Sequence, residues 1–200
     1  MTKVGLRERK KAATRERIVS VAIELFSARG IEAVTVEEIA AAADVGKGTV
    51  YNYFRAKEDV VVAFLVELDT RALEGVPALA DQPGDLAEAL NEAALRILEA
   101  KAGHHAFVRA FFARLFSSAD FLDQLGDLQI TLDRGIGGLL ERLKANGRIA
   151  AAVDVPAAIV TFKSLHMGLS ALWALQGPPY AGAREQCRIQ MSMLAKELAP

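Results

Sequence analysis

Side chains suited to binding a partner gather between residues 47 and 57, where amine, hydroxyl and amide groups alternate with apolar ones. A lysine on a helix in the major groove of DNA can donate to guanine O6 and N7, and a threonine methyl group can contact a thymine methyl group. Glycine inside a helix costs roughly 1 kcal/mol relative to alanine, so Gly48 indicates that a base edge approaches the backbone there. We therefore predict base contacts from Lys47, Gly48 and Thr49.

Hydroxyl, amide and amine groups around this set could bind phosphate oxygens, which position a protein on DNA without reading its sequence. A helix start also presents free N–H groups that favour an anion. On this basis the predicted phosphate contacts are Thr35, Tyr51, Asn52, Tyr53 and Lys57. The alternative is that the polar groups between Lys47 and Lys57 form only a solvated helix surface.

Two short helices joined by a turn would position these side chains. Thr35 and Glu38 have the spacing of a capping box, which marks a helix start. We predict helices over residues 36–43 and 47–53, joined by the Asp44-Val45-Gly46 turn, which together make a helix-turn-helix. Six apolar or small residues are expected to face inward: Ile39, Ala40, Ala43, Val45, Val50 and Phe54.

Apolar residues recur at helical spacing along most of the chain, and no sustained alternation of period two predicts a strand. The predicted fold is all-α, with about nine helices separated by Gly, Pro and Asp clusters. We expect an N-terminal three-helix helix-turn-helix DNA-binding domain over residues 1–58 and a larger helical ligand-binding and dimerisation domain over residues 59–200, sharing the helix from Glu58. The other helices are predicted over residues 14–29, 58–74, 84–102, 104–117, 120–146, 155–176 and 182–198, with a loop over residues 77–83.

Charge is unevenly distributed along the sequence. Residues 1–17 carry seven Lys or Arg against two Glu, whereas the whole chain has a net charge of −1. Residues 1–13 of this basic end are either a disordered solubilising tail or an arm that contacts phosphates or the minor groove. The single Cys187 excludes an internal disulfide and a cysteine-based zinc site. With no secretory segment and no apolar run of about 18 residues, the chain is expected to be cytoplasmic and outside the membrane.

A stripe of aromatic residues supplies most of the aromatic side chains of the predicted larger domain. Pockets for small molecules are lined by aromatic and aliphatic groups with a few polar anchors. The candidate anchors include His104, His105 and Arg109, and ordinary core packing is the alternative for each aromatic residue. The predicted pocket residues are Phe107, Phe111, Phe112, Phe116, Phe162, His166 and Trp173, and Phe121 belongs to the same stripe.

Metal binding and catalysis have little support in the sequence. Adjacent helix residues such as His104 and His105 point about 100° apart and make a poor metal pair. No defensible nucleophile and base, phosphate loop or carboxylate pair is present. We expect no metal, no cofactor and no enzyme activity. The competing hypothesis is a helical small-molecule carrier or enzyme that uses His104, His105 or His166.

The last two predicted helices are apolar enough to need a partner surface. A four-helix interface between two copies, built from residues 156–176 and 184–198, would bury their apolar side chains, and its symmetry would call for a palindromic DNA site. The alternative is that both helices complete the core of a monomer.

Residues 14–58 resemble the DNA-binding domain of the tetracycline-repressor (TetR) family of transcriptional regulators. The resemblance lies in the helix that ends in Leu-Phe-Ser-Ala-Arg-Gly at Gly30, in Thr35, in the 47–54 segment Lys-Gly-Thr-Val-Tyr-Asn-Tyr-Phe, and in Lys57-Glu58. Asp44 and Gly46 depart from the family's usual Gly and Ser. The resemblance implies a homodimer with a ligand cavity inside each subunit, and it favours repression. Together with the aromatic residues and the two-fold symmetry, it leads us to expect a repressor that an unknown, largely apolar small-molecule effector releases from a palindromic operator.

Overall fold

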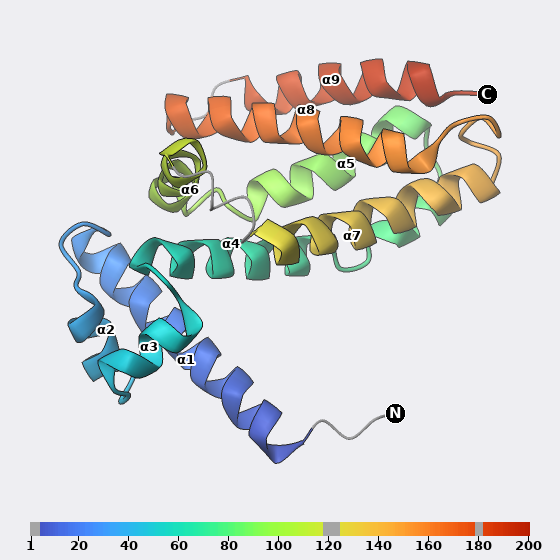
Figure 1. Ribbon diagram of the computed structural model, residues 1–200. Coiled ribbons are helices and arrows are strands. Elements are labelled where there is room, and N and C mark those ends of the chain that lie inside the picture. The colour runs from blue at the N-terminus through green and yellow to red at the C-terminus, as the bar shows by residue number, and fades with distance from the viewer. Residues whose placement is uncertain (1–4, 118–124, 179–181) are drawn as a thin grey trace. The chain divides into compact units, whose positions relative to one another are not determined.

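The computed structural model describes residues 5–117, 125–178 and 182–200 (Figure 1). These residues contain helices and no strand, so the predicted all-α class is confirmed. In the described ranges the α-helices are α1 (Leu6–Arg29), α2 (Val36–Ala42), α3 (Lys47–Tyr53), α4 (Lys57–Leu73), α5 (Leu86–Glu99), α6 (His105–Ser117), α7 (Gly126–Ala145), α8 (Val155–Gln176) and α9 (Ala183–Leu198). A 3-10 helix, η1 (Val76–Asp81), follows α4.

The chain divides into two compact units, residues 1–64 and 65–200. The division falls inside α4, the helix that the sequence analysis expected the two parts to share. The functional boundary at residues 58 and 59 stays a prediction.

The first unit is built from α1, α2, α3 and the start of α4. The capping box at the start of α2 is present: the Thr35 hydroxyl accepts from the Glu38 amide at 3.2 Å, and the Glu38 carboxylate accepts from the Thr35 amide at 2.8 Å. Asp44 turns the chain into α3 with a φ of 52°, a conformation that Asp adopts more readily than most residues. Ile18, Phe26 and Ile39 are fully or nearly fully buried and form part of the core.

The first helix begins earlier than predicted. It starts at Leu6 rather than near Thr14, so residues 6–13 are helical and the disordered-tail interpretation is wrong for them. Leu, Arg, Glu, Lys and Ala fill this stretch, and all of them favour helices over other conformations. Residues 6–13 are all exposed, and the first fully buried residue of α1 is Ile18.

The second unit is a bundle that contains α5 to α9 and η1. Helix α9 packs on α5 and α8, α7 packs on η1 and α8, and α6 packs on α8. Figure 1 shows α8 and α9 running side by side. Asp154 caps α8 by accepting from the Ala157 amide, and a proline lies in the first turn of α8. The fully buried core includes Leu90, Ile97, Leu139, Leu140 and Phe162.

One other segment differs from the sequence prediction. Residues 77–83 were expected to form a loop, but η1 covers most of them. Gly75, with a φ of 76°, ends the preceding turn, and a proline is tolerated in the first turn of η1 because no helical N–H is required there. The predicted start of the seventh helix at residue 120 lies outside the described residues.

Helix α8 is long and apolar enough, by length and composition, to cross a membrane. One such helix is weak evidence, because a core helix of a bundle passes the same test. Part of α8 is core in this structure, since Phe162, Leu169 and Trp173 are buried.

Candidate functional sites

The predicted DNA-facing side chains lie on the outer side of α3. Lys47, Gly48 and Asn52 are exposed, Tyr51 is 47% exposed, and Thr49 and Tyr53 are half-buried. The inward set is confirmed for five of its six members: Ile39, Ala40, Ala43, Val50 and Phe54 are buried, and Val45 is half-buried. The division into an apolar inner face and a polar outer face therefore agrees with the sequence analysis. Contact of these residues with bases or phosphates stays a prediction.

Lys47 has a partner that the sequence analysis missed. Its ammonium group forms an ion pair with Glu37 in the first turn of α2 and lies 5.8 Å from the centre of the Tyr51 ring. The hydrogen bond to Lys47 lowers the pKa of Glu37, and the same bond raises the pKa of Lys47. The pairing of an acid before the turn with a base after it was the signal available in the sequence. A DNA duplex would have to compete with this carboxylate for Lys47.

Thr35 and Glu38 are held in a network at the start of α2. The Glu38 carboxylate accepts from the Thr35 amide and from the Thr35 hydroxyl, at 2.8 and 3.0 Å, and pairs with Arg29 at 2.7 Å. These bonds, led by the one from the Thr35 amide, lower the pKa of Glu38 to about 2. The network fixes the end of α1 against the start of α2, which is where a phosphate contact from Thr35 is predicted.

Lys57 forms hydrogen bonds to the backbone of its own chain. Its side-chain nitrogen donates to the carbonyl oxygens of Ile31, Glu32 and Val34, at 2.7, 3.3 and 3.1 Å. These three residues form the segment between α1 and α2. The phosphate contact of Lys57 stays a prediction, and it would require the amine to leave these carbonyls.

Six of the seven predicted pocket residues are buried, on two helices that pack against each other. Phe107, Phe111 and Phe112 belong to α6, and Phe162, His166 and Trp173 belong to α8. Phe116 differs: it is 81% exposed, with its ring stacked on Phe112 at a centroid distance of 6.2 Å. Phe121 lies outside the described residues. The identity of the residues that contact a ligand stays a prediction.

The candidate polar anchors lie in different surroundings. His105 is close to Ala174, with its Nε2 2.5 Å from the carbonyl oxygen, and its ring meets the edge of Trp173. His104 stacks on Phe107, and Arg109 is exposed. His166 is buried, and burial lowers its pKa to about 3 with a further contribution from the charge of Lys101. His166 is therefore neutral, and it is the most deeply buried of these candidate polar groups.

The sequence analysis missed a buried ion pair in the same unit. Asp69 on α4 is 2% exposed, Lys101 after α5 is 8% exposed, and their side chains are paired. Asp69 lies four residues after Leu65 and four before Leu73, both of which are buried. A carboxylate in the middle of an apolar helical stripe was the signal that could have revealed this site.

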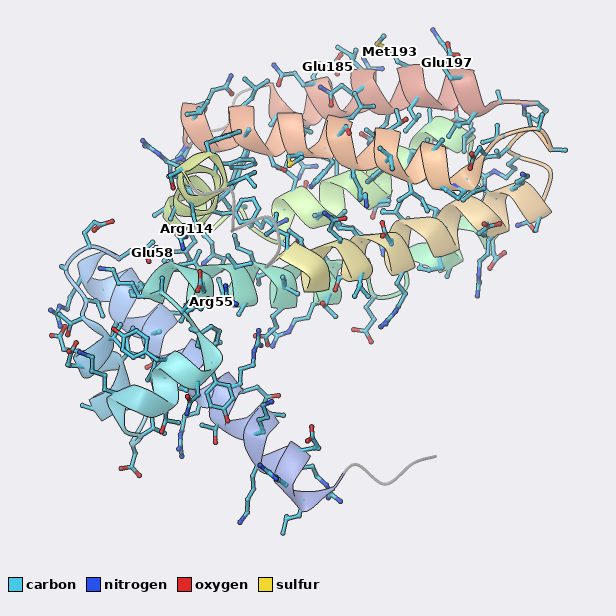
Figure 2. The ribbon with its side chains drawn as sticks, viewed as in Figure 1. Arg55, Glu58, Arg114, Glu185, Met193 and Glu197 are labelled. Atoms are coloured by element: carbon cyan, nitrogen blue, oxygen red, sulfur yellow. The ribbon has the colours of Figure 1, made fainter. Side chains whose placement is uncertain are left out.

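Apolar side chains are exposed on the outer faces of α8 and α9. Val160, Met167 and Leu175 on α8 are 59%, 48% and 73% exposed, and Met193 on α9 is 64% exposed. A groove of about 530 Å³ runs between the two helices, and Met193 and Glu197 line it. Figure 2 shows both of these side chains on the outer side of α9. Such a surface suits a partner, and none of the predicted pocket residues lines this groove.

Among the residues that the structure describes, no three His, Cys, Asp or Glu side chains form a group that could hold a metal ion. The thiol of Cys187 is buried, and burial raises its pKa to about 11. A thiol of this kind is mostly protonated at neutral pH and is a poor nucleophile.

Comparison of the sequence with known families and proteins finds similarity to bacterial regulators over part of the chain. Residues 18–64 match the family model described as bacterial regulatory proteins, tetR family. The transcriptional regulator TcmR of Streptomyces glaucescens is 41% identical over 75 residues, which cover 34% of this chain and 33% of TcmR. The regulator AcrR of Shigella flexneri is 31% identical over 118 residues, 58% of this chain and 54% of AcrR. The chain thus aligns with about a third to a half of the length of these relatives.

Solved structures match over most of the chain. One is the TetR-family transcriptional repressor FadR of Thermus thermophilus, determined in complex with lauroyl-CoA. It is 26% identical in sequence, with a TM-score of 0.77, and the match covers 90% of this chain and 92% of the FadR chain. FadR of Bacillus subtilis, in complex with stearoyl-CoA, has 20% identity and a TM-score of 0.67 over 92% of this chain and 98% of its own. The second likeness concerns the fold alone.

Proposed function

This chain belongs to the tetR family of bacterial regulatory proteins, and we propose that it is a cytoplasmic, homodimeric, sequence-specific DNA-binding transcriptional regulator without enzyme activity. In this proposal it represses transcription from a palindromic operator and leaves the DNA when a small, largely apolar ligand binds.

The proposal rests mainly on the polar side chains that face outward from α3. Lys47, Gly48 and Thr49 occupy the first turn of α3, and the N-terminal turn of a recognition helix is the part that meets base edges. Tyr51, Asn52 and Tyr53 follow on the same short helix, within reach of the backbone on either side of the groove. The basic residues of α1 add attraction to phosphates that depends on salt.

A homodimer through α8 and α9 would cover the exposed apolar side chains of both helices. Two copies related by a two-fold axis present two identical recognition helices, which read two halves of a palindrome. The groove beside Met193 and the exposed Val160, Met167 and Leu175 support this assignment.

Release from DNA requires that the ligand prefer the conformation that does not bind the operator. The aromatic residues buried on α6 and α8 support an apolar ligand. The Thermus thermophilus relative was determined with lauroyl-CoA, a ligand whose acyl chain is apolar. In our proposal α4, which belongs to both units, transmits the change.

The experiment that tests the proposal is selection of bound duplexes from a random DNA pool by the purified protein. We expect recovery of one palindromic sequence with two equal half-sites, bound with strong salt dependence. The Lys47→Ala and Tyr51→Phe variants should lose operator affinity. Arg134→Ala, which removes an exposed cation from α7, outside the proposed dimer helices, should retain it. Recovery of unrelated sequences, or unchanged affinity in the Lys47→Ala and Tyr51→Phe variants, would refute the proposal.

A further inference from the structure

The ion pair between Asp69 and Lys101 is buried inside the second unit. It links α4 to the turn that follows α5. Removing two charges from water offsets most of their mutual attraction, and an apolar pair of similar size often stabilises a protein equally well. The pair therefore needs an explanation other than stability.

His166 provides an independent sign of a ligand. Its side chain is buried, its ring stacks on Phe162, and its Nε2 lies 3.3 Å from the Ser170 hydroxyl. Its Nδ1 has no hydrogen-bond partner among the described residues. An unpaired buried nitrogen destabilises a fold unless some other molecule bonds to it. The charge of Lys101 acts on this ring, so the two groups share one region.

We propose that Lys101 and His166 bind the head of the effector, and that the effector is an apolar molecule with one carboxylate. The carboxylate takes the place of Asp69 on the Lys101 ammonium group and bonds to Nδ1 of His166, while its apolar body contacts the phenylalanines of α6 and α8. This inference rests on the proposed function, which assigns ligand sensing to this unit.

The charged groups around Lys101 favour an effector with an anionic head over one with a cationic head. Burial raises the pKa of Asp69, so the displaced side chain can take up a proton from solvent and remain inside as a neutral acid. A cationic ligand that captured Asp69 would instead leave the Lys101 ammonium buried without a counter-ion, which is strongly unfavourable.

The displacement would also act on α4. Asp69 is on this helix, and Lys57 at its start holds the segment between α1 and α2. Breaking the Asp69–Lys101 link therefore frees the helix that continues into the helix-turn-helix unit.

Fluorescence of Trp173, the sole tryptophan of the sequence, tests the inference without DNA. The probes are decanoate and phenylacetate, each compared with its alcohol, decanol or phenethyl alcohol. We expect saturable changes with at least one acid and much weaker binding of its alcohol. Lys101→Met should weaken binding of the acid by about tenfold or more, the effect of losing a hydrogen bond to a charged group. Asp69→Asn should strengthen it, because the competing carboxylate is gone.

Opposite effects of the two variants separate ligand binding from a purely structural role, which would weaken binding in both. The double variant Asp69→Leu/Lys101→Met replaces both charged groups by apolar ones, so it leaves no unpaired buried charge and keeps the test valid if a single variant misfolds. Circular dichroism checks its fold. It should lose the preference for the acid. Equal binding of acid and alcohol, weaker acid binding in Asp69→Asn, or unchanged acid binding in the double variant would overturn the inference. Lys101-dependent acid binding without operator binding would instead refute only the proposed function.

Discussion

The side-chain nitrogen of Lys57 lies 2.7 Å from the carbonyl oxygen of Ile31. The same ammonium group donates to the carbonyls of Glu32 and Val34, so one side chain binds three carbonyl oxygens of the segment between α1 and α2. The start of α4 is thereby tied to the segment that leads into α2. A movement of α4 would be transmitted to the helix-turn-helix through this amine.

Lys57→Met should lower the free energy of unfolding by about 1–3 kcal/mol, because partly buried carbonyls lose their donor. Urea unfolding measures this loss. A lysine that neutralises one phosphate adds about 0.9 to the slope of log DNA affinity against log salt concentration. Because the Lys57 amine is bound to carbonyl oxygens instead, we expect this slope to be the same in the Lys57→Met variant and in the wild type. Lys196→Met, at an exposed position on α9, is the control for stability. A smaller slope with unchanged stability would favour the phosphate contact instead.

Gly48→Ala should have opposite effects on stability and on DNA binding. A methyl group at residue 48 meets no atom within 4 Å in the free protein, so the better helix propensity of alanine should raise stability by up to about 1 kcal/mol. A base edge close to this backbone would clash with the methyl group. Operator affinity should then fall by about ten- to a hundredfold, as for the loss of one base contact. Thermal unfolding and operator titration measure the two effects, and unchanged operator affinity would remove Gly48 from the predicted base contacts.

The sequence predicted best those features that depend on neighbouring residues. The capping box of Thr35 and Glu38 and the alternation of buried and exposed positions from Ile39 to Phe54 follow from helical spacing alone. The start of α1 was also encoded locally, in helix-favouring residues from Leu6 onward, but their charge had suggested a tail.

Pairings between distant residues could not be predicted in the same way. Lys57 meets carbonyls more than twenty residues away, and Asp69 meets Lys101 only when α4 packs near the end of α5. Helical periodicity identifies the face on which a side chain lies but not the element that covers that face. The exposed position of Phe116, on the same helix as three buried phenylalanines, has the same cause.

Glu37→Gln should strengthen binding to DNA in general. The ion pair with Glu37 holds Lys47, and the carboxylate itself would face the phosphates of a bound duplex. Because exposed ion pairs contribute little, affinities for the operator and for an unrelated duplex should each rise by only about two- to fivefold at low salt. Glu92→Gln breaks a pair with Arg96 on α5, outside the helix-turn-helix and the proposed dimer helices, and should leave both affinities unchanged. A selective loss of operator binding in Glu37→Gln would show that Glu37 reads a base.

Glu38 should make the stability of the protein depend on acid pH. Its pKa is about 2 in the folded protein, below the ordinary 4.5, because the carboxylate accepts from the Thr35 amide and pairs with Arg29. A carboxylate with a lowered pKa stabilises the folded state above pH 4.5, and this contribution is lost as the pH falls toward 2. Urea unfolding of the wild type and of Glu38→Gln across this range should therefore give a difference in stability that is largest near neutral pH and shrinks with acid. Glu32→Gln removes an exposed carboxylate between α1 and α2 and serves as the control. A difference that stays constant from neutral pH to pH 2 would show that Glu38 does not stabilise the fold through its charge.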